Sequence, residues 1–446
     1  MNTQTRSTWG EAQHLTQRVV RTLEHFLHIE AVSGGVLIFA TLAALLWANS
    51  PAADAYHHLW HTPISLGIGE YRAQQSLHFL VNEGLMTLFF LLAGLEIRRE
   101  LHEGALSTLK QATLPLIAAF GGVLLPAAIY LSINSGTELA QGWAVPIATD
   151  IAFALGVLAL LGTAIPRNVR VLLLALAIID DVLAVLVIAL FYSDALQPSG
   201  AWLSLIALTM VLLLQRLGIR SALIYIAPSA LLWFGLLQLG LHPTLAGVML
   251  GLITPVAPLS DRSHMGKLSE RIGKTLWLAK RQRIGDEALV TSLRDIQQAQ
   301  RDVIPPVVEV QSALHPWIAY GLMPLFAFAN AGVTLDAADA GMDVTPMVVG
   351  IVLALLLGKF LGIFGASAIA VRLGWCKLSD DVGWRGLCLA AMLGAIGFTM
   401  SIFIATLAFG EGALLESAKL AVLIASLLAA LLSFALGKML YSKASQ

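Results

Sequence analysis

Apolar stretches long enough to cross a bilayer recur along this chain of 446 residues, and they constrain its fold more than any other feature. A helix needs about 20 mostly apolar residues to span the hydrocarbon core. Twelve such segments are visible, the eighth short and entered through Leu241-His242-Pro243-Thr244, which favours a tilted or partial helix. The predicted spans are 31–49, 77–97, 112–132, 143–162, 168–191, 200–216, 220–237, 242–256, 314–334, 345–371, 385–410 and 414–437.

Charged residues are too few to cover a soluble protein. They make up 12% of the chain, about half of the roughly 25% typical of globular proteins. The fold class is therefore an all-α polytopic membrane protein with about twelve transmembrane helices. The 27 basic and 28 acidic residues leave no basic excess, so we expect no nucleic-acid partner. Cys376 and Cys388 fit no metal-ligand spacing and are interpreted as packing residues, and no cofactor is expected.

Lysine and arginine gather in alternate connections between the spans, as the positive-inside rule requires of cytoplasmic loops. Both termini and the long loop are therefore expected on the cytoplasmic side. The predicted organisation is an interfacial N-terminal segment, eight helices, a charged cytoplasmic loop and four further helices, at 1–30, 31–256, 257–313 and 314–440. Helical spacing of apolar residues favours an amphipathic helix in the first segment, with a disordered tail as the alternative.

The connection at 61–72 carries a short β pattern. Ile64, Leu66 and Ile68 alternate with small or polar residues, which is typical of a hairpin strand. The pattern predicts a small extracytoplasmic hairpin, whose exposed edge would pair with a second copy and give a homodimer. A plain loop is equally compatible with these residues.

Apart from residues near the span ends, such as Glu96 and Lys419, five ionisable residues lie inside the apolar spans: Glu83, Asp150, Asp180, Asp181 and Lys359. A charged group at the bilayer centre costs several kcal/mol unless it is paired or hydrated, so each is a candidate functional residue. Two adjacent carboxylates at such depth repel each other, and at least one would hold a proton or take up a cation. Lys359 needs an anionic partner, which the three aspartates supply.

Two spans contain signals for interrupted helices. Pro146 removes a backbone donor shortly before Thr149 and Asp150 in span 4. Gly394 and Gly397 lie in the middle of span 11, followed by two hydroxyl residues. Spans 3–5 and 10–12 would then form an inverted repeat, each with one broken helix at its centre. A kinked but intact span 4 and simple close packing through the glycines are the alternatives.

These motifs resemble the NhaA family of bacterial sodium/proton antiporters. The resemblance runs from about residue 28 to 440, apart from the long loop. It is carried by 148–156 (ATDIAFALG), 175–181 (ALAIIDD), Gly358-Lys359 and 397–405 (GFTMSIFIA), and also by 325–333 (LFAFANAGV) and 89–96 (FFLLAGLE).

The resemblance implies a multi-pass protein of the bacterial inner membrane in which discontinuous helices 4 and 11 cross. It further implies that Asp180 and Asp181 bind Na⁺ and protons at the end of a cytoplasmic funnel. Thr149 would contribute a ligand oxygen. Asp150 would offset the positive helix ends at the crossing, and Lys359 the negative ones, Lys359 also acting as a possible proton carrier paired with Asp180.

Several residues are candidates for pH regulation by the same resemblance. Glu96 and Arg99 match the family's cytoplasmic charge cluster, and Glu83 stands where the family commonly has aspartate. Gln311 and Ser312 occupy positions where some members have an acidic residue and a histidine. His242 and His315 remain as nearby histidines, so the pH threshold is expected to differ.

The predicted function is electrogenic, pH-regulated export of Na⁺ and Li⁺ in exchange for H⁺, serving pH homeostasis and salt tolerance. Protons and sodium would compete for the same carboxylates, and alternating access would expose them to either side. Sodium-coupled solute symport on a related inverted-repeat fold is the alternative. An intramembrane aspartyl protease is disfavoured because its Tyr-Asp and Gly-x-Gly-Asp motifs are absent, so the chain is not expected to be an enzyme.

Overall fold

The computed structural model of the chain describes residues 32–68, 71–104, 106–193, 197–219, 221–257, 304–334 and 344–441. The predicted N-terminal segment 1–30 and most of the predicted loop 257–313 lie outside these residues. The chain divides into two compact units, each treated by itself below. The first comprises 1–86, 105–194 and 316–446, and the second comprises 87–104 and 195–315.

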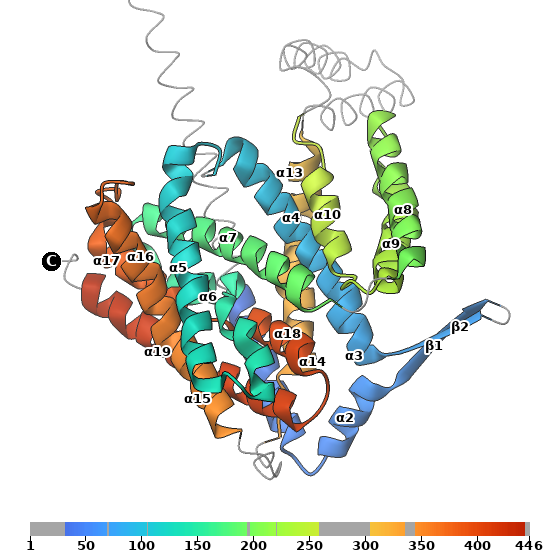
Figure 1. Cartoon of the computed structure of the whole chain (residues 1–446), viewed down its shortest axis with the longest axis horizontal. Coiled ribbons are helices and arrows are strands. Elements are labelled where there is room, and N and C mark those ends of the chain that lie inside the picture. Colours follow the sequence, from blue (N-terminus) through green and yellow to red (C-terminus); the bar gives the residue numbers. More distant parts are fainter. Residues whose placement is uncertain are drawn as a thin grey trace, which may run out of the picture. The chain divides into compact units, whose positions relative to one another are not determined.

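The described part of the first unit is built mainly from helices (Figure 1). Several of them are broken or contain a π-helical turn. Its early elements are Val32–Ala48, α2 (Ala53–His61), α3 (Leu77–Phe79), π-helix η1 (Leu80–Leu85), α5 (Leu109–Asn134), 3₁₀-helix η2 (Glu138–Ile147), α6 (Ile151–Leu160), η3 (Gly162–Ala164) and α7 (Arg167–Phe191). Its later elements are π-helix η4 (Ile318–Leu322), α14 (Met323–Asn330), α15 (Thr345–Leu353), π-helix η6 (Ala354–Lys359), α16 (Phe360–Arg372), α17 (Gly383–Leu393), α18 (Phe398–Phe409) and α19 (Ala413–Tyr441).

The second unit contains α8 (Pro198–Arg216), α9 (Ala222–Leu239) and α10 (Leu245–Ile253), with most of α4 (Met86–Glu103) and α13 (Pro306–Trp317). Helix α13 begins eight residues before the predicted start of span 9 at 314. The reason is local, because proline is favoured at the first position of a helix, where its missing N–H leaves no bond unmade.

Among the described residues, seven helices are long and apolar enough to cross a membrane, or ten if each bent pair counts as one span. The chain is therefore a multi-pass membrane protein. The bent pairs are Val32–Ala48 with α2 at 113°, η2 with α6 at 46°, and α17 with α18 at 42°. Predicted span 8 corresponds to α10, whose nine residues rise only about 13 Å, roughly half of a bilayer core.

Two strands, β1 (Pro63–Ile68) and β2 (Tyr71–Ser76), form an antiparallel pair in the region where the sequence predicted a hairpin. Pro63 pairs with Ser76 and Ile68 pairs with Tyr71. The second strand continues to Ser76, four residues past the predicted end at 72.

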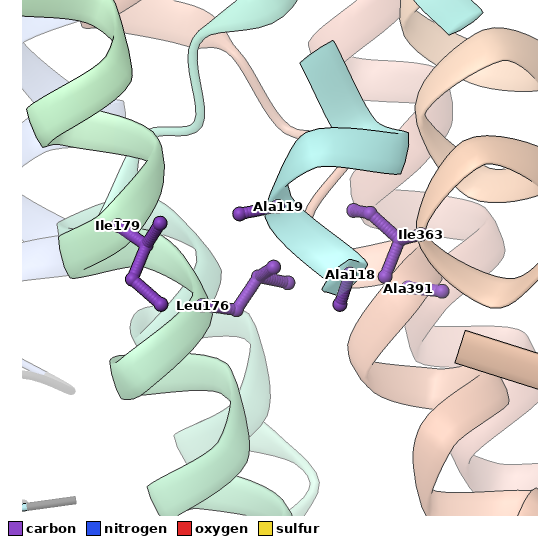
Figure 2. Close-up of a cluster of buried hydrophobic side chains, with 6 residues drawn as sticks. All are labelled: Ala118, Ala119, Leu176, Ile179, Ile363 and Ala391. Atoms are coloured by element: carbon purple, nitrogen blue, oxygen red, sulfur yellow. The ribbon is translucent and has the colours of Figure 1, made fainter. Parts of the chain in front are cut away.

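Small side chains let the helices of the first unit pack closely. Gly121 of α5 and Gly362 of α16 lie where the two backbones meet, and a side chain at either position would overlap the other residue's carbonyl group. Close approach through small residues is the usual way in which membrane helices associate. Figure 2 shows the apolar cluster beside this contact, formed by Ala118 and Ala119 of α5, Leu176 and Ile179 of α7, Ile363 of α16 and Ala391 of α17. Ile179, the residue of this cluster nearest the C-terminal end of α7, directly precedes Asp180.

Candidate functional site

Two interrupted helices meet in the first unit. The 3₁₀-helix η2 contains Pro146 and ends at Ile147, and α6 begins at Ile151 after an extended backbone. The second break lies between α17 and α18, at 394–397. The amide of Asp150 donates a 2.7 Å hydrogen bond to the carbonyl of Ile396, so each break supplies a partner for the other's free backbone groups. Irregular backbone in a membrane protein needs such internal partners because lipid offers none.

Asp150 caps the starts of two helices at once. Its Oδ1 accepts a 3.0 Å hydrogen bond from the amide of Phe153 in α6. Its Oδ2 accepts from the amide of Thr399 in α18 at 3.1 Å and also from the Thr399 hydroxyl. Asp150 is 1% exposed, so its negative charge faces the positive ends of both helices rather than water.

Lys359, Asp180 and Thr149 form a second buried set. The Lys359 ammonium lies 2.5 Å from Asp180 Oδ2 and 2.5 Å from the Thr149 hydroxyl. The Thr149 hydroxyl lies 2.7 Å from Asp180 Oδ2 and 2.9 Å from the carbonyl of Gly394, and its single hydrogen can be donated to one of them at a time. The break before α6, helix α7 and the π-turn η6 thus each bring one side chain to this set, and the second break adds the Gly394 carbonyl.

A π-helical turn presents Lys359 to this set. The turn η6 spans Ala354–Lys359, inside what would otherwise be one helix from Thr345 to Arg372. Such bulges insert one extra residue and re-aim the side chains around it, and they occur frequently at functional sites. Lys359 has no exposed surface, which rules out snorkelling to the interface.

Asp181 follows Asp180 on α7 and is 2% exposed. Its negative charge also acts on the Lys359 ammonium. Oδ1 of Asp180 is buried and accepts no hydrogen bond from the residues that the structure describes. Carboxylate, hydroxyl and carbonyl oxygens are the ligands that hard cations prefer, so this set could hold an alkali cation. Because Asp181 itself is buried, the described residues show no path from it to water, and the funnel toward the cytoplasm stays a prediction.

The predicted regulatory residues lie elsewhere. In the second unit, Arg99 of α4 donates a 2.8 Å hydrogen bond to Gln311 Oε1 of α13, and Gln311 Nε2 lies 3.3 Å from Glu96 Oε1. The charge of Arg99 also acts on His315, which lies one turn after Gln311. His242 lies in the link between α9 and α10, and Glu83 lies in η1 of the first unit.

The first unit also contains a buried network of neutral polar side chains, which a search of the sequence for ionisable residues does not find. Asn330 at the end of α14 donates to Asn82 Oδ1 at 2.7 Å, while Asn82 Nδ2 lies 3.3 Å from Asn330 Oδ1. The His78 ring nitrogen Nε2 lies 3.1 Å from the same Asn330 oxygen. The bonds from Thr399 to Asp150 are likewise not predicted, because Thr399 is distinguished in the sequence only as a hydroxyl beside a break. The sequence signal that could have identified these residues is any polar residue inside an apolar segment, whether charged or neutral.

The family model described as Na⁺/H⁺ antiporter 1 matches residues 24–436. The chain is 56% identical over 438 residues to the Na⁺/H⁺ antiporter NhaA of Janthinobacterium sp., covering 98% of this chain and 97% of that one. It is 54% identical over 428 residues to the Na⁺/H⁺ antiporter NhaA 2 of Pseudomonas putida, covering 96% of this chain and 94% of that one. It is 54% identical over 429 residues to NhaA of Cupriavidus necator, covering 96% and 92%.

Proposed function

Because this chain belongs to the Na⁺/H⁺ antiporter 1 family and is a transporter that exchanges Na⁺ for H⁺, we propose that the exchange takes place at Asp180 and Asp181. Their burial beside Lys359 carries the proposal. Thr149 supplies a further oxygen ligand, and Asp150 holds the two breaks in register.

Competition between protons and sodium explains the exchange. With both carboxylates ionised beside the Lys359 ammonium, the one ammonium that contacts Asp180 among the residues the structure describes, the empty site holds excess negative charge out of water, which is costly. Binding either protons or one alkali cation relieves this cost, so the protein changes its open side only when loaded. Na⁺ entering beside Asp180 displaces Lys359 from the shared carboxylate. Lys359 is therefore a second group from which a proton can leave, coupled to the two carboxylates.

The direction of exchange follows from the driving forces across a bacterial inner membrane, where we place this protein with both termini in the cytoplasm. Na⁺ or Li⁺ leaves the cell while protons enter. Movement of more protons than sodium ions makes the exchange electrogenic, and each net charge gains about 2.3 kcal/mol per 100 mV of membrane potential. The twelve-span inverted repeat, with the two broken helices at its centre, is part of the same proposal.

The β1–β2 hairpin serves dimerisation in this proposal. It is a two-stranded sheet, so each strand has one edge without a partner in the part of the chain that the structure describes. Pairing of such an edge with a second copy is a common route to a homodimer.

Control by pH is assigned to the set around Gln311. A neutral amide bridges Glu96 and Arg99 in this chain, and an acidic side chain there would compete with Glu96 for the single guanidinium. We expect Gln311→Glu to move the onset of exchange to higher pH, because one of the two carboxylates would stay protonated longer. The measurement is Na⁺-driven proton flux against pH. Ala313→Glu, at an exposed position of the same helix, is the control and should leave the profile unchanged.

The test of the site itself is Asp181→Asn in proteoliposomes, with Na⁺, Li⁺ and K⁺ offered in turn across a pH series. Na⁺-driven proton flux should fall to that of protein-free vesicles, because an amide neither releases a proton nor neutralises a cation. Asp381→Asn, which changes a carboxylate on the surface beside Asn168, should retain full exchange. Full exchange by Asp181→Asn would end the site assignment. Flux that required an added organic solute would favour the symport alternative.

A further inference from the structure

Helix α2 is held firmly at one face. Tyr56 and Trp60 are buried, and their rings make edge-to-face contacts with Phe328 at 6.0 and 5.9 Å between centroids. The Tyr56 hydroxyl donates a 2.6 Å hydrogen bond to the carbonyl of Phe328. The nine residues of α2 are therefore ordered before any ligand arrives.

The next face of α2 carries His57 and His61, one residue after Tyr56 and Trp60 respectively. Residues four apart on a helix are neighbours, with Cβ atoms about 5–6 Å apart. His57 is half-buried, and its ring meets the Tyr56 ring edge to face at 5.4 Å. His61 is exposed at the end of the helix.

The hydrogen bonding of His61 prepares it as a metal ligand. Its Nδ1 lies 2.8 Å from the carbonyl oxygen of His57, and a carbonyl only accepts. Nδ1 therefore carries the hydrogen, and Nε2 keeps a lone pair. Metal-ligating histidines usually donate their other ring N–H to a carbonyl or carboxylate in this way, which fixes the tautomer and the ring orientation.

We propose that α2 carries a two-histidine site for a divalent transition metal, with Zn²⁺ bound by His57 and His61. Two histidines at i and i+4 on one helical face are the spacing that binds zinc in other helices. Among the described residues, no group of three or more His, Cys, Asp and Glu side chains is arranged to hold a metal. With two protein ligands from the described residues, water would fill the other two positions of a tetrahedral Zn²⁺, one more than in open zinc sites with three protein ligands. This site is separate from the exchange site and takes no part in the proposed antiport.

The experiment is a Zn²⁺ titration of the purified full-length chain in detergent, followed by competition with a chromogenic chelator. We expect one Zn²⁺ per chain at this site. His57→Ala and His61→Ala should each weaken that binding at least about tenfold, since even loss of a supporting hydrogen bond costs 10–100-fold in metal affinity. Alanine is the best helix former, so α2 should persist, and circular dichroism with gel filtration checks folding.

The matched control is His58→Ala, which removes an exposed histidine of the same helix. It should bind Zn²⁺ like the parent chain, and an equal loss in this variant would overturn the assignment to His57 and His61. Absence of Zn²⁺ binding to the parent chain would overturn the site altogether. Asp181→Asn should bind Zn²⁺ unchanged even when exchange is lost, so the two proposals fail independently.

Discussion

Two buried polar sets in the first unit are built alike but differ in charge. Lys359 meets Asp180 and Thr149 from the π-turn η6, and Asn82 meets Asn330 from the π-turn η1. In the amide set, Asn82 and Asn330 donate to each other, so both are satisfied without any net charge. In the ionic set, one ammonium serves carboxylates that outnumber it. The comparison shows that burial is common to both sets and that unbalanced buried charge is what sets the proposed exchange site apart.

The largest expected effect follows from removing the ammonium of the ionic set. Lys359→Ala leaves Asp180 without its cation, and breaking a buried pair on one side costs about 3–5 kcal/mol unless the carboxylate takes up a proton. We expect lower thermal stability and a smaller net charge moved per cycle, measured by unfolding in detergent and by membrane-potential dependence of flux. Lys359→Arg keeps the ion pair but cannot release a proton, so it should restore stability more than charge movement.

Lys438→Ala is the matched lysine control, since that side chain is exposed and lies over the Phe434 ring. Lys438→Ala should change neither the thermal stability nor the net charge moved per cycle. Unchanged electrogenicity in Lys359→Ala would contradict the role of Lys359 as a proton carrier and would make the two polar sets equivalent.

The amide set should show the reverse pattern, with an effect on stability and little on ion selectivity. Asn330→Leu leaves the Asn82 side-chain oxygen buried without the hydrogen bond that Asn330 donates, and it removes the acceptor shared by Asn82 and His78, which costs about 1–3 kcal/mol. Thermal unfolding measures the loss, with Asn168→Leu, at a partly exposed position beside Asp381, as control. Adding Asn82→Leu should then cost less than it does alone, because its partner is already gone. An altered preference between Na⁺ and Li⁺ in Asn330→Leu would contradict the distinction between the ionic set and the amide set.

The smallest expected effect concerns the hydroxyl of Thr149. Thr149→Val preserves the shape of the side chain but removes a hydrogen bond from both Lys359 and Asp180 and a ligand oxygen. We expect the KM for Na⁺ to rise about tenfold, corresponding to about 1.4 kcal/mol. Thr149→Ser should restore the parent value. Thr209→Val, at an exposed hydroxyl on α8, is the control, and an equal rise there would remove the special role of Thr149.

The sequence by itself determined the class of this protein and the short set of residues on which its proposed chemistry depends. Long apolar segments indicate a multi-pass membrane protein, and ionisable residues such as Asp180 and Lys359 are conspicuous because hydrocarbon penalises them. Pro146 and the paired glycines also predicted where the breaks lie, since both residues act on the local backbone.

Only the tertiary structure decided which of these residues meet. The family resemblance implied that Lys359 pairs with Asp180, but the contact itself depends on how η6, α7 and the two breaks pack, because no local pattern encodes a contact between residues 179 positions apart. The same holds for the bond between Thr399 and Asp150 and for the Asn82–Asn330 network. These contacts form because each polar group, once buried, must find a partner among whatever the packing brings near.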